Sequence, residues 1–265
     1  MFIFASKPMT ILMRKIKTAM LFVGLCMVLA ACNPSPDAVE IALKTEGIKD
    51  GEEMSVSLGC THAEEPELAT ATLKDGKVTF RFTSEGPRMY YVTVKGAAGR
   101  LKVMADQGDH VKVTAKAERS LRYDGVLIYE FSDVVVKGSK THSEYEDRNL
   151  DLSRLNTLSP HYQERFPDVL EALQNAQTQQ QRDSVLASDR GRQMVKAETD
   201  FFQTVQKVYS ECFLENRDSW WGPLLLLDYM NYPTSTERGI YEQFSERAKQ
   251  SFYGKIAHDV LYQEE

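Results

Sequence analysis

The stretch Lys74-Asp75-Gly76-Lys77-Val78-Thr79-Phe80-Arg81-Phe82 decides the fold class of this chain. Val78, Phe80 and Phe82 alternate with polar residues, and a period of two is typical of a strand with one buried face. Asp-Gly directly before such a run is a strong signal for a hairpin turn. The stretch therefore predicts an antiparallel hairpin whose second strand lies against an apolar core.

The same alternation continues on both sides of this stretch. Turn sequences such as Lys49-Asp50-Gly51 and Gln107-Gly108-Asp109 separate the runs, at roughly ten-residue spacing. The other inward positions are Val39, Ile41, Leu43, Met54, Val56, Leu58, Tyr90, Val92, Val94, Leu101, Val103, Ala105, Val111, Val113, Val126, Ile128, Val134 and Val136. About seven or eight short strands are predicted, forming an antiparallel β-sandwich over residues 38–138.

After Gly138 the apolar period becomes that of a helix. Thr141 and Thr234 are each followed three residues later by Glu, which predicts a capping box at the start of a helix. Leu224 to Leu227 make a later helix apolar on every side, and hence buried. Residues 139–265 are therefore predicted to form an α-helical domain, and the fold class is α+β.

One long helix is predicted to carry a core-facing stripe. Its apolar positions are Met194, Phe201, Val205, Val208 and Cys212, with Phe202, Tyr209 and Phe213 beside them. Such a stripe is more often core than the wall of a ligand site.

The start of the chain has the order of an export signal. Arg14, Lys15 and Lys17 precede an apolar run that is too short to span a membrane, which needs about 20 apolar residues. Leu29-Ala30-Ala31-Cys32 resembles the bacterial lipobox at every position. The resemblance implies that residues 1–31 are a lipoprotein signal peptide, that Cys32 carries the lipid, and that the new amino terminus is acylated.

An ordinary secreted protein is the alternative to this lipoprotein. Residues 32–37, with Asn33-Pro34-Ser35-Pro36, are predicted to form a stiff lipidated tether. By analogy with lipoprotein sorting, the absence of an acidic residue beside Cys32 favours the outer membrane, facing the periplasm. Met1 and Met13 both remain candidates for the true start.

Charge limits the partners of the chain. Its net charge is −6, and removal of the four Lys and Arg residues of the signal would leave −10. Nucleic acid binding needs a basic face, so we expect no nucleic acid partner. The expected partners are a membrane, through the lipid on Cys32, and a protein or a second copy of the chain.

Two cysteines remain after the signal and the lipid site are set aside. Cys60 and Cys212 lie in different halves of the chain and form no Cys-x-x-Cys motif. An exported protein allows a disulfide between them, but only if their Cα atoms come within about 7 Å. Two buried free thiols are the favoured interpretation.

The sequence shows no constellation of catalytic residues. The five histidines have neither the spacing nor the partners of a zinc site, and the glycine motifs of phosphate loops and nucleophile elbows are missing. We therefore expect no metal, no cofactor and no enzymatic activity. Trp220, Trp221 and Tyr229 are candidates for a ligand groove between the two domains, although core packing is the more common role of such residues.

A family resemblance is carried by several short stretches. They are Asp75-Gly76-Lys77-Val78-Thr79-Phe80, Gln107-Gly108-Asp109-His110-Val111-Lys112-Val113, Val136-Lys137-Gly138-Ser139 and Lys249-Gln250-Ser251-Phe252-Tyr253-Gly254-Lys255. With the lipobox, this order is similar to the amino-terminal domain of unknown function (DUF4369 type) in lipoprotein thiol-disulfide oxidoreductases. In those proteins a thioredoxin-like, peroxiredoxin-related domain with a Trp-Cys-x-x-Cys motif follows. No residue of this chain matches that motif.

Three functional hypotheses follow. The first is a non-catalytic, lipid-anchored cell-envelope protein that acts as an interaction or binding module. The second is a truncated or split oxidoreductase whose thioredoxin-like domain is lost or encoded separately. The third is small-ligand binding in an interdomain groove.

Overall fold

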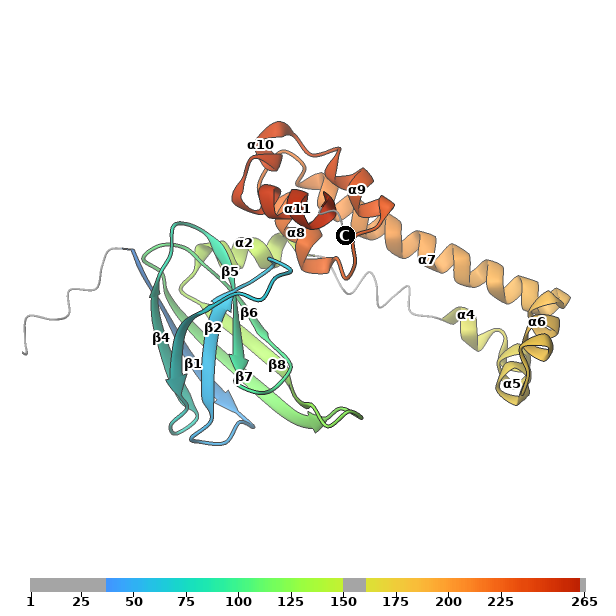
Figure 1. Cartoon of the computed structure of the whole chain (residues 1–265), viewed down its shortest axis with the longest axis horizontal. Coiled ribbons are helices and arrows are strands. Elements are labelled where there is room, and N and C mark those ends of the chain that lie inside the picture. Colours follow the sequence, from blue (N-terminus) through green and yellow to red (C-terminus); the bar gives the residue numbers. More distant parts are fainter. Residues whose placement is uncertain (1–36, 150–160, 263–265) are drawn as a thin grey trace, which may run out of the picture.

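The computed structural model describes residues 37–149 and 161–262 (Figure 1). The predicted signal peptide, the lipid site Cys32 and all but the last residue of the predicted tether lie outside these residues. The described part has an amino-terminal pair of β-sheets followed by helices, which confirms the α+β fold class.

Eight strands form two four-stranded sheets within the described residues, and they stack as a sandwich. The sheet orders are β4-β1-β7-β8 and β3-β2-β5-β6. The strands are β1 (Ala38–Glu46), β2 (Glu53–Leu58), β3 (Glu67–Thr72), β4 (Lys77–Thr83), β5 (Arg88–Val94), β6 (Leu101–Ala105), β7 (His110–Leu121) and β8 (Leu127–Lys137).

The predicted alternation matches the observed burial in β1, β4 and β7. In β4 every second side chain is buried, and Phe80 pairs with Ile41 of β1 across the sheet. These positions belong to one core between the sheets, in which Val39, Ile41 and Val56 are fully buried. Burial of such aliphatic side chains stabilises the fold by about 1.5–3 kcal/mol each.

The predicted alternation is wrong in β8. There Leu127, Tyr129 and Phe131 pack against the core in place of Val126 and Ile128. Val134 is 38% exposed beside a shift in the register with β7.

Two further features of the sandwich differ from the prediction. β1 and β7 are parallel neighbours, because they are joined by a long crossover through β2 to β6 and not by a hairpin. β3 was not predicted, because its Ala-Thr alternation contains no large apolar residue after Leu68. It is an edge strand with no fully buried side chain, held by its pairing with β2.

The helices begin directly after the sandwich. They are α2 (Lys140–Arg148), α4 (His161–Glu164), α5 (Pro167–Asn175), α6 (Gln179–Ala187), α7 (Asp189–Glu215), α8 (Trp221–Tyr229), α9 (Ser235–Tyr241), α10 (Glu246–Lys249) and α11 (Phe252–Tyr262). In the part of the chain that the structure covers, no helix combines the length and the apolar character needed to cross a membrane.

The two predicted capping boxes have different outcomes. The box at Thr234 and Glu237 is present at the start of α9. The box at Thr141 is wrong, because α2 begins two residues earlier and Ser139 is its N-cap, accepting a hydrogen bond from the backbone N–H of His142 at 3.2 Å.

The long helix α7 extends away from the sandwich and carries α4, α5 and α6 at its far end (Figure 1). We call residues 161–202 the arm. Its own small core consists of Phe166, Val169 and Met194, with partly buried neighbours. Along the predicted stripe of α7, Met194 and Val208 are buried, whereas Phe201 and Val205 between them are only partly buried. The flanking Phe202 is 58% exposed.

The two halves share a core. Cys60, Met89 and Met104 of the sandwich are buried in the same apolar cluster as α8 and α11. Side chains of the helices also accept hydrogen bonds from the sandwich backbone, with Met89 N–H donating to Tyr253 Oη at 2.7 Å and Met104 N–H to His142 Nδ1 at 3.1 Å. The helices are thus packed against the end of the sandwich that carries Cys60, Met89 and Met104.

Candidate functional site

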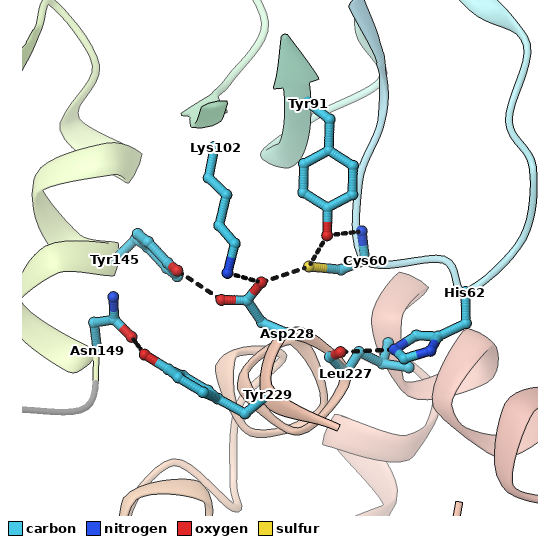
Figure 2. A network of polar contacts seen from close by, with 9 residues as sticks. All are labelled: Cys60, His62, Tyr91, Lys102, Tyr145, Asn149, Leu227, Asp228 and Tyr229. Atoms are coloured by element: carbon cyan, nitrogen blue, oxygen red, sulfur yellow. Dashed lines mark hydrogen bonds and ion pairs between the residues drawn. The ribbon is translucent and has the colours of Figure 1, made fainter. Parts of the chain in front are cut away.

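A buried carboxylate lies where the two halves meet, and it organises the polar network shown in Figure 2. Asp228 follows four leucines in α8, and the helix is buried from Trp221 to Leu227. The side chain of Asp228 is 0% exposed. Because a charge at such depth is costly unless it is paired, its partners define the site.

Three segments from elsewhere in the chain supply those partners. Lys102 of β6 lies with its Nζ 2.7 Å from Oδ1 of Asp228. The hydroxyl of Tyr145 in α2 donates to Oδ2 at 2.6 Å, and the thiol of Cys60, in the loop after β2, donates to Oδ1 at 3.3 Å. The carboxylate therefore connects edge strand β6, the loop after β2 and the helices α2 and α8 at one point.

Cys60 is held on both sides of its thiol. Its backbone N–H donates to the hydroxyl of Tyr91 at 3.0 Å, and that hydroxyl lies 3.4 Å from Sγ. With Sγ–H directed to Asp228, the Tyr91 hydroxyl donates to the sulfur. Burial, and then the negative charge of Asp228, raise the pKa of the Cys60 thiol far above its ordinary value.

The neighbouring tyrosines are also kept protonated. Burial is the first cause that raises the pKa of Tyr145, and the charge of Asp228 is the second. For Tyr91 the pKa is raised by burial and then by Cys60. Each of these groups serves as a hydrogen-bond donor at neutral pH, so the network consists of protonated donors around one carboxylate.

The loop that carries Cys60 has an unusual backbone. Cys60 and His62 have φ angles of 59° and 55°, in the left-handed region that non-glycine residues rarely adopt. Gly59 precedes them, and a Cβ there would lie 2.8 Å from Cγ of Met89. His62 fixes the far side of the loop, because its Nε2 donates to the backbone carbonyl of Leu227 at 2.7 Å.

This arrangement suits a structural joint better than a nucleophile. A reactive thiol needs a lowered pKa, which comes from nearby cations or helix N-termini, whereas Cys60 faces a carboxylate. Cys212 is a free thiol as well, with Sγ 3.5 Å from the backbone carbonyl of Arg148, and burial raises its pKa to about 11. In the structure the two cysteines have separate partners and form no disulfide with each other.

Two hollows lie beside the end of α8. A polar cavity of about 290 Å³ adjoins Cys60 and Asp228 and includes Arg100 and Glu65 in its wall. A larger apolar groove of about 520 Å³ lies among α7, α8 and α9. Met230 and Asn231 line both, so the turn after α8 separates them.

The structure separates the three residues predicted to form an interdomain groove. Tyr229 lines the apolar groove, which lies within the helical half, and donates a hydrogen bond to Asn149. Trp220 stacks on Trp221 with ring centroids 4.0 Å apart, and Trp221 is buried in the shared core. The cavity between the halves is lined by none of the three.

Most aromatic residues of the apolar groove were predicted from the sequence to be core residues. Phe202, Tyr209 and Phe213 of α7 line it, together with the 80% exposed Tyr232. Within residues 37–149 and 161–262, no cluster of three or more His, Cys, Asp or Glu is placed to hold a metal ion.

The central residue of the site, Asp228, was not singled out by sequence reasoning. A signal was available, because a single acid after Leu224 to Leu227 in a fully buried helix requires a partner. Lys102 and Tyr145 gave no such signal, since a lysine on an alternating strand and a tyrosine on a helix are ordinary surface and core residues.

The comparisons with known proteins address the sandwich. Residues 55–145 match the family described as "Domain of unknown function (DUF4369)", and no curated protein matches the chain. The matched region contains Cys60, Tyr91, Lys102 and Tyr145, whereas Asp228 lies outside it. About one third of this chain is thus similar to the DUF4369 family, and that third supplies most of the network around the carboxylate.

Proposed function

We propose that this protein is a non-catalytic, lipid-anchored cell-envelope protein that works as an interaction module. The lipobox-like Leu29-Ala30-Ala31-Cys32 supports the anchor, with the protein on the outer membrane and facing the periplasm. The anchor would hold the sandwich and the helical half beside the membrane surface, where a binding partner meets them.

The observation that carries the non-catalytic part is the state of Cys60. In thiol-disulfide exchange the thiolate is the attacking group, so the thiol needs a pKa near the ambient pH. Cys60 is 2% exposed and donates to the buried Asp228, which stabilises the protonated thiol. Its role is therefore to hold the loop after β2 against α8.

The apolar groove is the surface that suits a protein partner. Phe202 and Tyr232 are 58% and 80% exposed at its edge, and aromatic side chains of this kind contribute strongly to protein interfaces. Glu237 is the one Asp, Glu, Lys or Arg among its described lining residues, and its carboxylate caps α9. An apolar partner surface fits this lining.

Disulfide reduction tests the proposed function. The purified full chain is incubated with insulin and dithiothreitol, and precipitation of the insulin B chain is followed. We expect the same rate as dithiothreitol alone. A faster rate that disappears in the Cys60→Ser or Cys212→Ser variant would show a catalytic thiol and overturn the non-catalytic part.

Membrane fractionation tests the anchor separately. We expect wild-type protein in the outer-membrane fraction and the Cys32→Ala variant as an unacylated precursor. Cys26→Ala is the matched control, since it removes a nearby cysteine of the apolar run without touching the lipobox. A wild-type protein that lacks acyl chains by mass spectrometry contradicts the anchor.

Small-ligand binding is the second candidate function, and the polar cavity between the halves favours it. The cavity lies against the network of Asp228, whose groups are fixed by hydrogen bonds. Preorganised polar groups beside a cavity are a common feature of ligand sites.

A further inference from the structure

The polar cavity beside Asp228 has a definite size. Its volume of about 290 Å³ is close to the lower end of the roughly 300–1,000 Å³ that is common for small-molecule sites. A small ligand therefore fits. Its wall is mainly polar, with Thr61, His62 and Asn231 among the lining residues.

The charges in the wall are of both signs. Asp228 is paired with Lys102 at 2.7 Å, so this pair adds little net charge. Arg100 and Glu65 also line the cavity, and neither has an ion-pair partner among residues 37–149 and 161–262. One cation and one anion thus remain to interact with a ligand.

Arg100 is placed to receive a carboxylate. Its guanidinium carbon lies 4.4 Å from the centroid of the Tyr91 ring. Stacking uses the face of the guanidinium and leaves the N–H groups at its edge, which bind carboxylates in a bidentate manner. The Tyr91 ring is itself fixed by its hydrogen bonds to Cys60, so the arginine rests on a rigid support.

The negative side of the cavity is formed by the carboxyl end of α8 and by Glu65. Leu227, Asp228 and Met230 at the carboxyl end of this helix line the cavity. The carboxyl end of a helix carries partial negative charge and favours a cation. Glu65, in the loop that follows Cys60 and His62, adds a full negative charge. A simple anion would meet this negative side, and a simple cation would meet Arg100.

We propose that the cavity binds a small zwitterion, namely a free amino acid or a dipeptide. The carboxylate of the ligand pairs with Arg100, and its ammonium group faces Glu65 and the end of α8. The left-handed backbone of Cys60 and His62 agrees with this role, because strained residues concentrate where a ligand is held. The proposal specifies the ligand class of the second candidate function and rests on it.

Calorimetric titration of the full chain in detergent tests the proposal. The probes are L-alanine and L-alanyl-L-alanine, and the matched blocked compounds are N-acetyl-L-alanine and L-alaninamide. We expect at least one zwitterion to bind saturably, and each blocked compound to bind about tenfold more weakly or worse, because one charged contact is lost. Absence of saturable heat with both zwitterions at about 10 mM overturns the proposal.

Two variants test which residue contacts each charged group of the ligand. Arg100→Gln should weaken the zwitterion and N-acetyl-L-alanine, whereas Glu65→Gln should weaken the zwitterion and L-alaninamide. Arg119→Gln is the control, because Arg119 is an exposed arginine on β7 that does not line the cavity. Zwitterion binding that Arg100→Gln leaves unchanged overturns the proposal. A failure here is distinct from a failure of the main proposed function, which is measured by insulin reduction and by acylation at Cys32.

Discussion

Lys102 and Asp228 form an ion pair of 2.7 Å that joins an edge strand of the sandwich to the most buried helix of the carboxyl-terminal half. The lysine is 36% exposed and the aspartate is 0% exposed. The pair is therefore asymmetric, since Lys102 regains water if the contact breaks and Asp228 does not. This asymmetry determines which substitution is expected to cost more.

Removal of the lysine should destabilise the protein strongly. Lys102→Met leaves the carboxylate of Asp228 buried without its cation, and we expect a loss of about 3 kcal/mol in the free energy of unfolding. Adding Asp228→Asn should restore about 2 kcal/mol, because the buried charge is removed while an oxygen remains for Tyr145. Urea denaturation of the full chain in detergent measures both values.

Lys112→Met is the matched control for this experiment. Lys112 is an exposed lysine on β7, and its loss should change stability by less than about 0.5 kcal/mol. If Lys102→Met and Lys112→Met have the same effect, the ion pair does not hold the halves together.

Gly59 should tolerate no side chain. A Cβ at this position would lie 2.8 Å from Cγ of Met89 and 2.9 Å from the Tyr91 ring, and the hydroxyl of Tyr91 is fixed by Cys60. We expect Gly59→Ala to cost about 1–3 kcal/mol in urea denaturation. Gly239→Ala is the matched control, because that glycine lies in α9 with open space around it, and the change should stabilise by about 0.5 kcal/mol or more. Equal effects of the two variants would contradict the close packing at Gly59.

His142 should make stability depend on pH. Its Nδ1 accepts from the backbone N–H of Met104, and burial lowers its pKa below the ordinary 6.5, opposed in part by Glu146. The unfolded chain therefore binds the proton first as the pH falls. The stabilising contribution is complete above pH 6.5 and is lost as the pH falls from there through the lowered pKa, by at most about 1.4 kcal/mol per pH unit.

Urea denaturation between pH 7.5 and pH 5 is the measurement, at about half-unit steps. His142→Asn keeps an acceptor for Met104 and removes the titration, so its stability should fall less steeply with acid than that of wild type. His110→Gln removes a histidine whose side chain is 67% exposed and should retain the wild-type slope. Identical slopes in wild type and His142→Asn would show that His142 does not titrate in this way.

The arm should open independently of the sandwich. Among the described residues, the core of the arm consists of three buried apolar side chains, so little apolar area holds α4, α5 and α6 to α7. We expect Val169→Ala to increase amide hydrogen exchange in these helices and in the amino-terminal part of α7, while exchange in β1 and β7 stays unchanged. Faster exchange in the sandwich as well would show that the arm is coupled to it.

The strands of the sandwich could be predicted because one face of each is exposed to solvent, which gives an alternating sequence. Phe80 and Val111 stand in alternating runs, and both are buried as expected. β3 was missed for the same reason, since its inward positions are alanines only partly buried at the edge of a sheet. The arm was missed because a stripe such as that of α7 shows which face is apolar, but not whether another element covers it.

The site was harder to predict from the sequence than the fold. Cys60, Lys102, Tyr145 and Asp228 come from four segments, and only the packing of α8 against the sandwich brings them together. The buried acid in α8 shows that a partner is needed, but the identity of that partner depends on the fold. Cys60 was considered as half of a disulfide, whereas its contacts in the structure are with Tyr91 and Asp228.

The reactivity of Cys60 with iodoacetamide as a function of pH tests the account most directly, with peptide mass spectrometry to separate it from Cys212. In the native protein we predict almost no modification of Cys60 at neutral pH, and rapid modification of the same residue once the chain is unfolded in urea. Rapid modification of native Cys60 with an apparent pKa below about 8 would contradict the account, since the thiol would then be poised to react.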